Sequence, residues 1–333
     1  MQHRREFRWL RYLASEVSHV SHYALLDVEA TIAARGVPSV AHRPNSFTRL
    51  FAKVLARMRL VGNLGRWGRG PVLVTLMGHS EHKTVPFAYW TEVVPYCFDC
   101  WEPEWPRWES FFRRHRTRLA FFTARQSADH FRHVLPGLTS VWLPEAVNLY
   151  EYKPERPLRD RSVDVLEFGR KFDRFHDAIV AGLDAAGRAH QYERVKGAVI
   201  FKSNGAFRAA LGDAKISVCF PGSMTHPERS GSVETVTRRY FESIASKCVL
   251  VGRCPRELAD LFGYNPVVEV ETGKELDQVN VILSDIDRFQ PLVEKNYARL
   301  REKGSWESRV STILEHTGWL ASDTQVEVGR QRC

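Results

Sequence analysis

One stretch in the second half of the chain combines acidic and basic side chains at the start of a predicted helix. Glu234 and Glu242 are eight residues apart, and Arg238 and Arg239 lie between them. A short apolar run at 249–252 predicts a buried strand that follows the helix. Apolar side chains recur here at the i, i+3, i+4, i+7 spacing of an amphipathic helix packed on a core. They are Val233, Val236, Tyr240, Phe241, Ile244, Ala245 and Cys248.

The start of this helix predicts a binding site for an anion. Thr237 is a suitable N-cap, so the free N–H groups of the first turn would point outward at the positive end of the helix dipole. Phosphate is the usual anion at such a position. Arginine donates to two phosphate oxygens, and a carboxylate accepts hydrogen bonds from neighbouring sugar hydroxyls. The residue types therefore predict a ligand with a diphosphate and a sugar. For the spacing alone, a solvated ion-pair surface is the alternative.

The same residues resemble a known enzyme site. Glu234-x7-Glu242 is similar to the nucleotide-sugar site of GT-B glycosyltransferases of the group 1 type, which contains many retaining enzymes. Residues 239–242, Arg-Tyr-Phe-Glu, resemble the Arg-x-Phe-Glu signature of one branch. The resemblance implies that Glu242 holds the ribose hydroxyls and that Glu234 contacts the donor sugar, which makes Glu234 a catalytic candidate. Lys247 departs from the family, which usually has Gly there for a left-handed turn.

Two further segments match this family in chain order. Residues 144–154 resemble its interdomain passage through Pro144, Val147, Asn148, Tyr152 and Pro154, whereas Glu145 and Ala146 depart from it. Gly169 and Arg170, after a predicted strand at 163–168, resemble the turn that grips the donor diphosphate. The second cation of that grip is Lys171 or Arg174, and the sequence does not choose between them.

The resemblance implies an α/β protein of the GT-B fold, with two Rossmann-like domains facing across a cleft. The expected boundaries are an acceptor-side domain at 1–149, a nucleotide-sugar-binding domain at 150–304, and a terminal helix at 305–333 that crosses back to the first domain. The implied reaction is retaining transfer of a sugar from a nucleotide-sugar, without a cofactor or metal. Cationic side chains would stabilise the leaving diphosphate electrostatically. They are Arg170, Lys171, Arg238 and Arg239.

In the first domain, His79 and Asp99 follow predicted strands at 71–77 and 93–98. Ligands of doubly wound sheets bind at the carboxyl ends of strands, so both residues are catalytic candidates by location. A structural role is the alternative for each. Two other sets of residues could be mistaken for metal sites. The set His79, His82, Cys97 and Cys100 does not have the loop-rich surroundings of a zinc finger, and Asp285-x-Asp287 fits surface charge on a predicted late helix better than a metal site.

The net charge of +9 is concentrated in one region. Residues 30–80 contain no Asp or Glu after Ala30 but eight Arg and Lys residues, which predicts an anionic partner. A predicted helix at 47–61 is amphipathic and basic, so residues 47–69 could lie on an anionic membrane. A crossover helix with a solvated basic face is the alternative. No apolar run is long enough to span a membrane, and no secretory h-region follows the N-terminus.

The expected acceptor is therefore a cell-envelope saccharide or lipid-linked saccharide. The scattered cysteines indicate reduced thiols and a cytoplasmic protein, with a peripheral position on the inner face of the membrane. Two alternatives stay open. One is a nucleic-acid-binding or nucleic-acid-modifying protein, although no recognition motif accompanies the basic charge. The other is a non-catalytic relative of the fold that binds a nucleotide-sugar without releasing the nucleotide.

Overall fold

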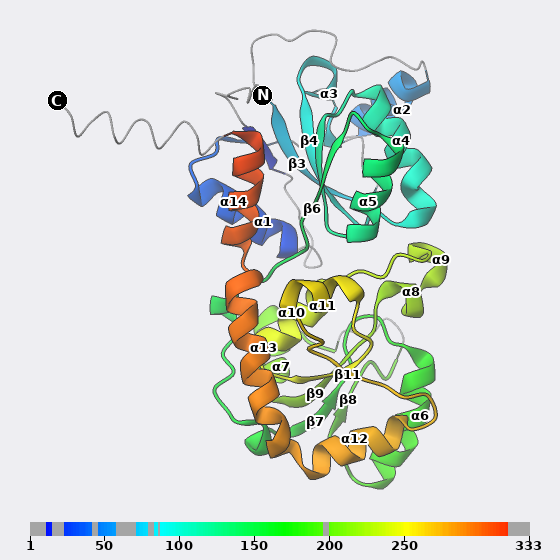
Figure 1. Ribbon diagram of the computed structural model, residues 1–333, viewed down its shortest axis with the longest axis vertical. Helices are drawn as coiled ribbons and strands as arrows, with labels where there is room; N and C mark the ends of the chain where they lie inside the picture. Colours follow the sequence, from blue (N-terminus) through cyan, green and yellow to red (C-terminus); the bar gives the residue numbers. More distant parts are fainter. Residues whose placement is uncertain are drawn as a thin grey trace, which may run out of the picture. The chain divides into compact units, whose positions relative to one another are not determined.

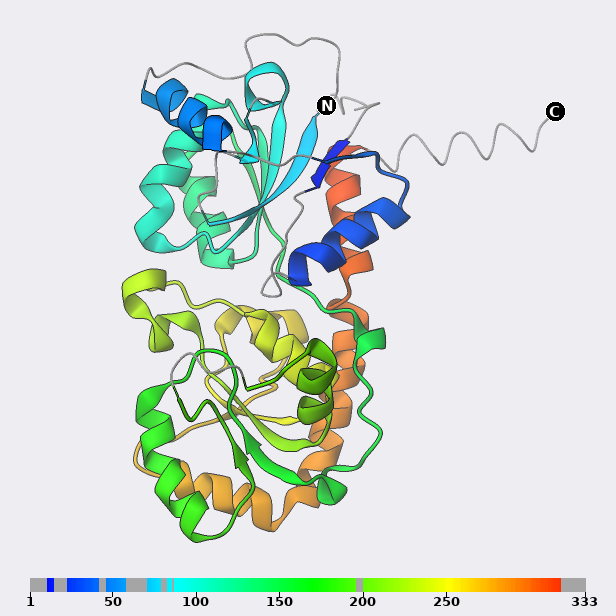
Figure 2. The ribbon, with the colours of Figure 1, turned by 180° about the vertical axis from the view of Figure 1, so that it is seen from behind.

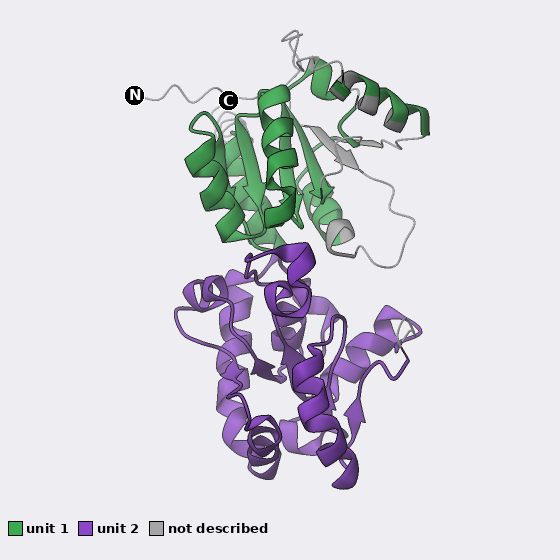
Figure 3. Ribbon diagram, turned by 90° about the vertical axis from the view of Figure 1, so that its right-hand side faces the viewer, with its two compact units in different colours: residues 1–144, 306–333 green, residues 145–305 purple. Residues whose placement is uncertain are grey.

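The structure is a computed structural model of the 333-residue chain. It describes residues 11–14, 23–41, 46–57, 71–78, 83–85, 87–195 and 200–318. The chain forms two compact units: residues 1–144 with 306–333, and residues 145–305 (Figure 3). The first boundary lies five residues before the expected one, at 144 instead of 149.

The first unit contains, within its described residues, a six-stranded parallel sheet in the order β2-β1-β3-β4-β5-β6 (Figure 1). Its strands are β1 (Arg11–Ala14), β2 (Ser39–Ala41), β3 (Val72–Met77), β4 (Val93–Phe98), β5 (Leu119–Phe122) and β6 (Thr139–Trp142). Its helices are α1 (Tyr23–Ala34), α2 (Ser46–Arg57), α3 (Phe87–Trp90), the 3-10 turn η2 (Glu102–Glu104), α4 (Trp105–Arg114), α5 (Arg125–Val134) and α14 (Trp306–Thr317).

Alternating apolar residues on the central strands of this sheet pack against aromatic helices. Val72, Val74 and Leu76 of β3 share a buried cluster with side chains of α4 and α5, among them Trp108 and Phe131. Helix α14 packs beside α1 in the same unit. Arg309 of α14 is buried, and its Nε donates to the carbonyl of Pro144 over 2.9 Å, which ties the last helix to the end of the unit's first segment.

The second unit contains a five-stranded parallel sheet among its described residues, in the order β11-β10-β9-β7-β8. Its strands are β7 (Val163–Leu166), β8 (His190–Gln191), β9 (Ala214–Cys219), β10 (Val249–Gly252) and β11 (Val268–Glu269). Its helices are α6 (Asp173–Ala185), α7 (Asn204–Gly212), α8 (Gly222–Thr225), α9 (Pro227–Ser230), α10 (Arg238–Ala245), α11 (Arg256–Phe262), α12 (Glu275–Ser284) and α13 (Gln290–Lys303), and its 3-10 turns are η3 (Leu149–Glu151), η4 (Leu158–Asp160) and η5 (Ile286–Phe289).

The strand order of the second unit places a topological switch between β7 and β9. After β7 the chain adds β8 on one side of it, and then crosses to add β9 on the other side. In open α/β sheets the ligand crevice lies at the carboxyl ends of the two strands that flank such a switch. The turns after Leu166 and Cys219 therefore occupy the positions where this fold binds ligands.

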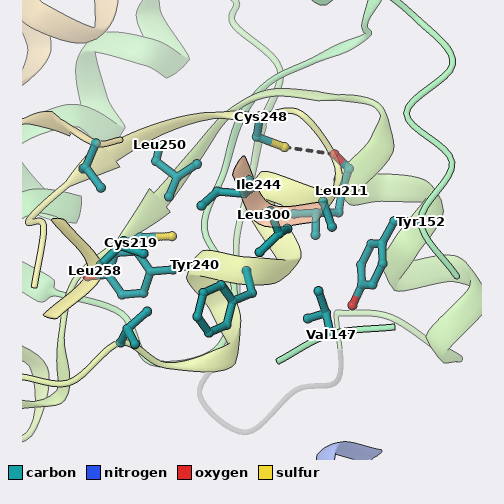
Figure 4. Close-up of a cluster of buried hydrophobic side chains, with 14 of the residues drawn as sticks. Val147, Tyr152, Leu211, Cys219, Tyr240, Ile244, Cys248, Leu250, Leu258 and Leu300 are labelled. Carbon is teal, nitrogen blue, oxygen red and sulfur yellow. Dashed lines mark hydrogen bonds between the residues drawn. The ribbon is translucent and has the colours of Figure 1, made fainter. Parts of the chain in front are cut away.

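Each face of this second sheet has its own buried core. Val249 and Val251 of β10 point into a cluster with α6 and α12, whereas Leu250 between them points to the cluster of α7, α10 and α11. This alternation is the period of two expected for a strand buried on both faces. Helices α6 and α12 lie side by side (Figure 1, and from behind in Figure 2). Figure 4 shows the other cluster, where the Cys248 thiol donates to the Leu211 carbonyl over 3.2 Å.

Helix α10 ends in a left-handed turn, as the resemblance implied, but with Lys247 in place of glycine. Lys247 has φ +53°, and the N–H groups of Lys247 and Cys248 bond the carbonyls of Ile244 and Ser243. These two bonds form a Schellman motif. The Lys247 ammonium also lies 2.7 Å from the Glu294 carboxylate, a contact that glycine cannot make. The turn is kept, although a Cβ at this φ is strained.

One predicted placement, that of Asp285 and Asp287 on a late helix, was wrong. Asp285 follows the end of α12 rather than lying inside a late helix, and Asp287 is in a 3-10 turn 3.4 Å from Arg159. In the part of the chain that the structure describes, no helix has the length and apolarity needed to cross a bilayer.

Candidate functional site

The turn after β7 contains Gly169 and Arg170, the predicted diphosphate-binding pair. Gly169 has φ +68°, a left-handed conformation that glycine adopts without strain. The Arg170 guanidinium reaches the turn after β9, where its Nη1 would lie 3.2 Å from a Cβ at Gly222. A Cβ at Gly222 would also lie 3.3 Å from Oγ of Ser230. Arg170 therefore lies between the two strand ends that flank the switch in the sheet.

Arg239 links this turn to the start of α10. Its Nη1 donates to the carbonyl of Arg170 over 2.6 Å and to that of Phe168 over 3.1 Å. Its side chain passes over Gly169, where a Cβ would lie 3.3 Å from Cδ. The structure thus brings together the Gly169–Arg170 turn and the helix that carries Glu242. In this arrangement the Arg239 guanidinium braces the backbone of the turn.

Glu242 is held by two neighbours on its Oε1 atom. Arg238, one helical turn earlier, donates its Nε over 2.9 Å, and the Tyr152 hydroxyl donates over 3.2 Å. The side chains of Arg238 and Glu242 are 15% and 12% exposed, so this pair is mostly withdrawn from water. Partial burial strengthens a charge-assisted hydrogen bond relative to one on the surface. Arg238 therefore orients Glu242 in this structure.

Glu234 lies in the extended segment before α10. Its Oε1 is 3.4 Å from Nε of Arg253, which follows β10, and Nη1 of Arg253 is 2.9 Å from Glu269. The Tyr240 hydroxyl of α10 donates to the Arg253 carbonyl over 2.7 Å. The segment that carries Glu234 is thereby attached at the carboxyl end of β10.

Glu257 fixes the next residues of that segment, and the sequence reasoning missed it. It is a buried carboxylate in the first turn of α11, and it accepts a 2.6 Å bond from the Thr235 hydroxyl together with the N–H of Val236. Nothing in the sequence distinguishes it from the many glutamates that begin helices, since its partners are about twenty residues away. Glu257 therefore ties the segment before α10 to the first turn of α11.

Thr237 occupies the N-cap position of α10, as predicted, but its side chain makes no capping hydrogen bond. Its Oγ1 is buried and has no hydrogen-bond partner among the described residues. The N-terminal N–H groups of α10 therefore do not receive a cap from Thr237. An anion could satisfy these groups.

The remaining donor-site candidate, Lys171, is partly exposed beside the same turn. Its Nζ lies 3.8 Å from Asp173, a loose pair with the aspartate largely in solvent. Such a pair contributes little, so the Lys171 ammonium can move toward a ligand. Arg174, the other candidate for the second cation, is exposed on α6.

A buried cluster of one glutamate and two histidines includes Glu167, two residues before Gly169. Oε1 of Glu167 is 2.7 Å from Nδ1 of His176 and 2.8 Å from Nε2 of His190. Burial alone would raise the pKa of Glu167, but the hydrogen bonds to the two histidines lower it. These three side chains could form a metal ligand set. Ligands of tetrahedral Zn²⁺ stand about 3.3 Å apart, since each is about 2.0–2.1 Å from the metal. The 2.7 and 2.8 Å separations between Glu167 and the two histidines are shorter than that and are typical of hydrogen bonds. The arrangement therefore fits a hydrogen-bonded cluster better than a set of zinc ligands.

The structure describes only some of the residues of the first unit that were predicted to be catalytic or metal-binding. Asp99 directly follows β4 and has φ +51°, a left-handed conformation that is uncommon outside glycine and that aspartate tolerates better than most residues. Residues with such backbone conformations cluster at active sites and ligand-binding segments. His79 and His82 lie outside the described residues. Cys97 and Cys100, the two cysteines of the possible zinc set, are buried. Burial raises the pKa of both thiols well above the ordinary value.

Solved structures of similar fold align with nearly the whole chain. A sucrose-phosphate synthase from Thermosynechococcus elongatus aligns with a TM-score of 0.60 at 10% identity, over 95% of this chain and 100% of that one. HepE from Anabaena in complex with UDP gives a TM-score of 0.59 at 10% identity, over 94% and 100% of the two chains. AviGT4, a glycosyltransferase involved in avilamycin A biosynthesis, gives 0.54 at 12% identity, over 94% and 98%.

The two units have the GT-B fold. This confirms the fold class predicted from the sequence. At such low identity the likeness establishes architecture only, and the residue roles depend on the site geometry. A scan of protein-family models gives no match, and a search of curated protein sequences gives none either.

Proposed function

We propose that this GT-B chain is a glycosyltransferase that moves a sugar from a nucleoside-diphosphate sugar to a saccharide acceptor. One observation carries the proposal. The Arg239 guanidinium of α10 bonds the carbonyls of Phe168 and Arg170 at the sheet switch of the second unit, so the turn that carries Arg170 lies against the helix that carries Glu242 and has no side-chain cap at its start. This combination suits a ligand with a diphosphate and a ribose.

Each residue has a role in the proposed reaction. Arg170 and Lys171 bind the diphosphate and stabilise the negative charge that grows on it as the bond to the sugar breaks. Glu242 accepts hydrogen bonds from the ribose hydroxyls, and Glu234 contacts the donor sugar. Arg238 and Arg239 support Glu242 and the turn. In this proposal the cations perform the charge stabilisation that a metal ion performs elsewhere, and no cofactor takes part.

Retention of configuration is the proposed stereochemical outcome. It rests on the Glu234-x7-Glu242 motif, which resembles that of many retaining enzymes. The HepE structure contains UDP, and a second HepE structure contains UDP-glucose. UDP and UDP-glucose are therefore the first nucleotide and the first donor to test with this chain.

The proposal is tested by thermal unfolding with a panel of nucleoside diphosphates and their sugars. A ligand at about 30 times its dissociation constant should stabilise the protein by about 2 kcal/mol. Release of the nucleoside diphosphate on addition of acceptor distinguishes an enzyme from a non-catalytic binder. Absence of any shift across uridine, guanosine, adenosine, cytidine and thymidine diphosphates would contradict the proposal.

For the acceptor we propose an anionic, lipid-linked saccharide reached at a membrane surface through α2. Phe47, Leu50, Phe51 and Val54 share the i, i+3, i+4, i+7 spacing and are 72%, 61%, 40% and 45% exposed. The rings of Phe47 and Phe51 stack at 6.2 Å. An exposed apolar stripe within an acid-free, basic stretch of sequence is the pattern of a helix that lies on anionic lipid. The alternative, a crossover helix that exposes its basic side alone, does not account for this stripe.

Vesicle binding tests the membrane proposal. The double substitution Phe47→Ser with Leu50→Ser should weaken binding to anionic vesicles by at least about tenfold, because two apolar side chains are then not buried in lipid. Val281→Ser removes a similarly exposed apolar residue from the second unit and should have no effect. Equal binding to neutral vesicles would contradict the proposal. A loss of self-association in the double variant would assign the stripe to a second copy of the chain.

A further inference from the structure

Tyr152 connects the segment that enters the second unit with the carboxylate proposed to hold the ribose. Its ring is 4% exposed and packs in the cluster with Val147 and Leu211 (Figure 4). Its hydroxyl donates to Oε1 of Glu242, ninety residues further along the chain, over 3.2 Å. In the sequence, Tyr152 is recognisable only as the aromatic residue of the passage at 144–154. A phenylalanine would fill the same apolar space, so packing alone does not account for the hydroxyl.

Both hydrogen bonds to Glu242 end on the same carboxylate oxygen, which leaves the other oxygen for a ligand. Oε1 accepts from both the Tyr152 hydroxyl and Nε of Arg238. A carboxylate has about four lone-pair sites, two on each oxygen, so these donors occupy the sites of Oε1. Oε2 is then the atom that can accept from a diol. Two donors from different directions also fix the carboxylate plane, which Arg238 alone would leave free to rotate.

The environment of Tyr152 keeps its hydroxyl a donor. A phenol is protonated at neutral pH in any case, and burial, followed by the negative charge of Glu242, raises the pKa of Tyr152 further. Arg208 lies with its guanidinium 5.8 Å from the ring centroid and pairs with Glu151. The peptide that carries Tyr152 is fixed as well, since the Tyr152 N–H bonds the Leu149 carbonyl over 3.1 Å. Both ends of this side chain are therefore held.

We propose that Tyr152 is a positioning residue that sets the orientation of Glu242 for the ribose of the donor. This inference rests on the proposed function, since it assumes that Glu242 accepts from the ribose hydroxyls. Its effect is on donor affinity rather than on the chemical step. Tyr152 is not in contact with the reacting atoms and is not assigned a catalytic role.

Tyr152→Phe removes the hydroxyl and leaves the ring. The dissociation constant for UDP, measured by calorimetry, and the KM for the donor should each rise about five- to tenfold, with kcat within about twofold of the wild type. Tyr150→Phe makes the same chemical change two residues away on a side chain that is 89% exposed, and it should leave both constants unchanged. The thermal midpoints of both variants should stay within a few degrees of the wild type.

A nucleotide that lacks the ribose diol shows whether Tyr152 acts by positioning Glu242 or only by supporting the structure. With 2′,3′-dideoxy-UDP, Tyr152→Phe and the wild type should bind with dissociation constants within twofold of each other, because Glu242 then has no hydroxyl to hold. An equal loss with UDP and with the dideoxy nucleotide would overturn the inference. So would wild-type affinity for UDP in Tyr152→Phe while Glu242→Ala abolishes binding. Failure of the wild type to bind any nucleotide would instead overturn the proposed function on which the inference rests.

Discussion

Replacing Glu242 by alanine should abolish the thermal stabilisation by nucleotide and weaken nucleotide binding about 100-fold or more. The carboxylate is expected to accept two hydrogen bonds from the ribose, and bonds to a charged group contribute roughly 1.5–3 kcal/mol each. Two such bonds correspond to a loss on the order of 10² to 10⁴ in affinity. Calorimetric titration with the nucleotide that gives the largest thermal shift measures this loss.

The same substitution should also lower the stability of the unliganded protein. Arg238 is 15% exposed and pairs with Glu242, so removing the carboxylate leaves a largely buried cation with less compensation. The expected cost is about 1–3 kcal/mol, measured by chemical denaturation. Glu302→Ala, at an exposed ion pair with Arg299 on α13, is the control and should change neither quantity. Nucleotide affinity that survives Glu242→Ala would remove Glu242 from the donor site.

The largest effect on folding is expected at Gly252, where β10 ends. Gly252 has φ +146°, and a Cβ there would lie 2.1 Å from the carbonyl oxygen of Cys219 and 2.9 Å from its carbonyl carbon. Both atoms belong to the backbone of the neighbouring strand β9 and cannot move aside as a flexible side chain would. Gly252→Ala should therefore lower the free energy of unfolding by about 3–5 kcal/mol. Urea denaturation measures the change.

Gly187→Ala separates the contact at Gly252 from the cost of a positive φ. Gly187 has φ +62°, and a Cβ there would meet nothing within 4 Å. Its substitution should cost only about 1 kcal/mol, the price of a side chain in a left-handed conformation. Equal costs at the two positions would show that the strand ends of β9 and β10 can separate. That result would contradict the close packing of β9 against β10 at Gly252 on which this prediction rests.

The sequence predicted the parts of the fold that depend on local pattern. Strands such as β3 and β4 are short apolar runs bounded by turn residues, and their spans were predicted to within a residue. Gly169 was predicted to lie in a turn, and it has a positive φ. Strand β8 was missed because His190–Gln191 is short and contains no apolar residue, so it gives no strand signal.

The site was predicted as a set of residues but not as a set of contacts. Arg238 and Arg239 were predicted to act on the donor diphosphate, a role that stays a prediction. In the structure their guanidinium groups bond Glu242 and the carbonyls of the Gly169 turn. Partner choice of this kind depends on segments about seventy to ninety residues apart, as for Arg239 with Phe168 and Tyr152 with Glu242. Composition and periodicity contain no information on such pairs.

The most direct test of the central claim is the position of a bound nucleotide in a crystal of this protein. We expect the diphosphate of UDP, or of the nucleotide that gives the largest thermal shift, at the carboxyl ends of β7 and β9, in contact with Arg170 and the first turn of α10. The ribose hydroxyls should lie within hydrogen-bond distance of Oε2 of Glu242. A nucleotide bound elsewhere in the second unit, with its ribose away from Glu242, would contradict the account.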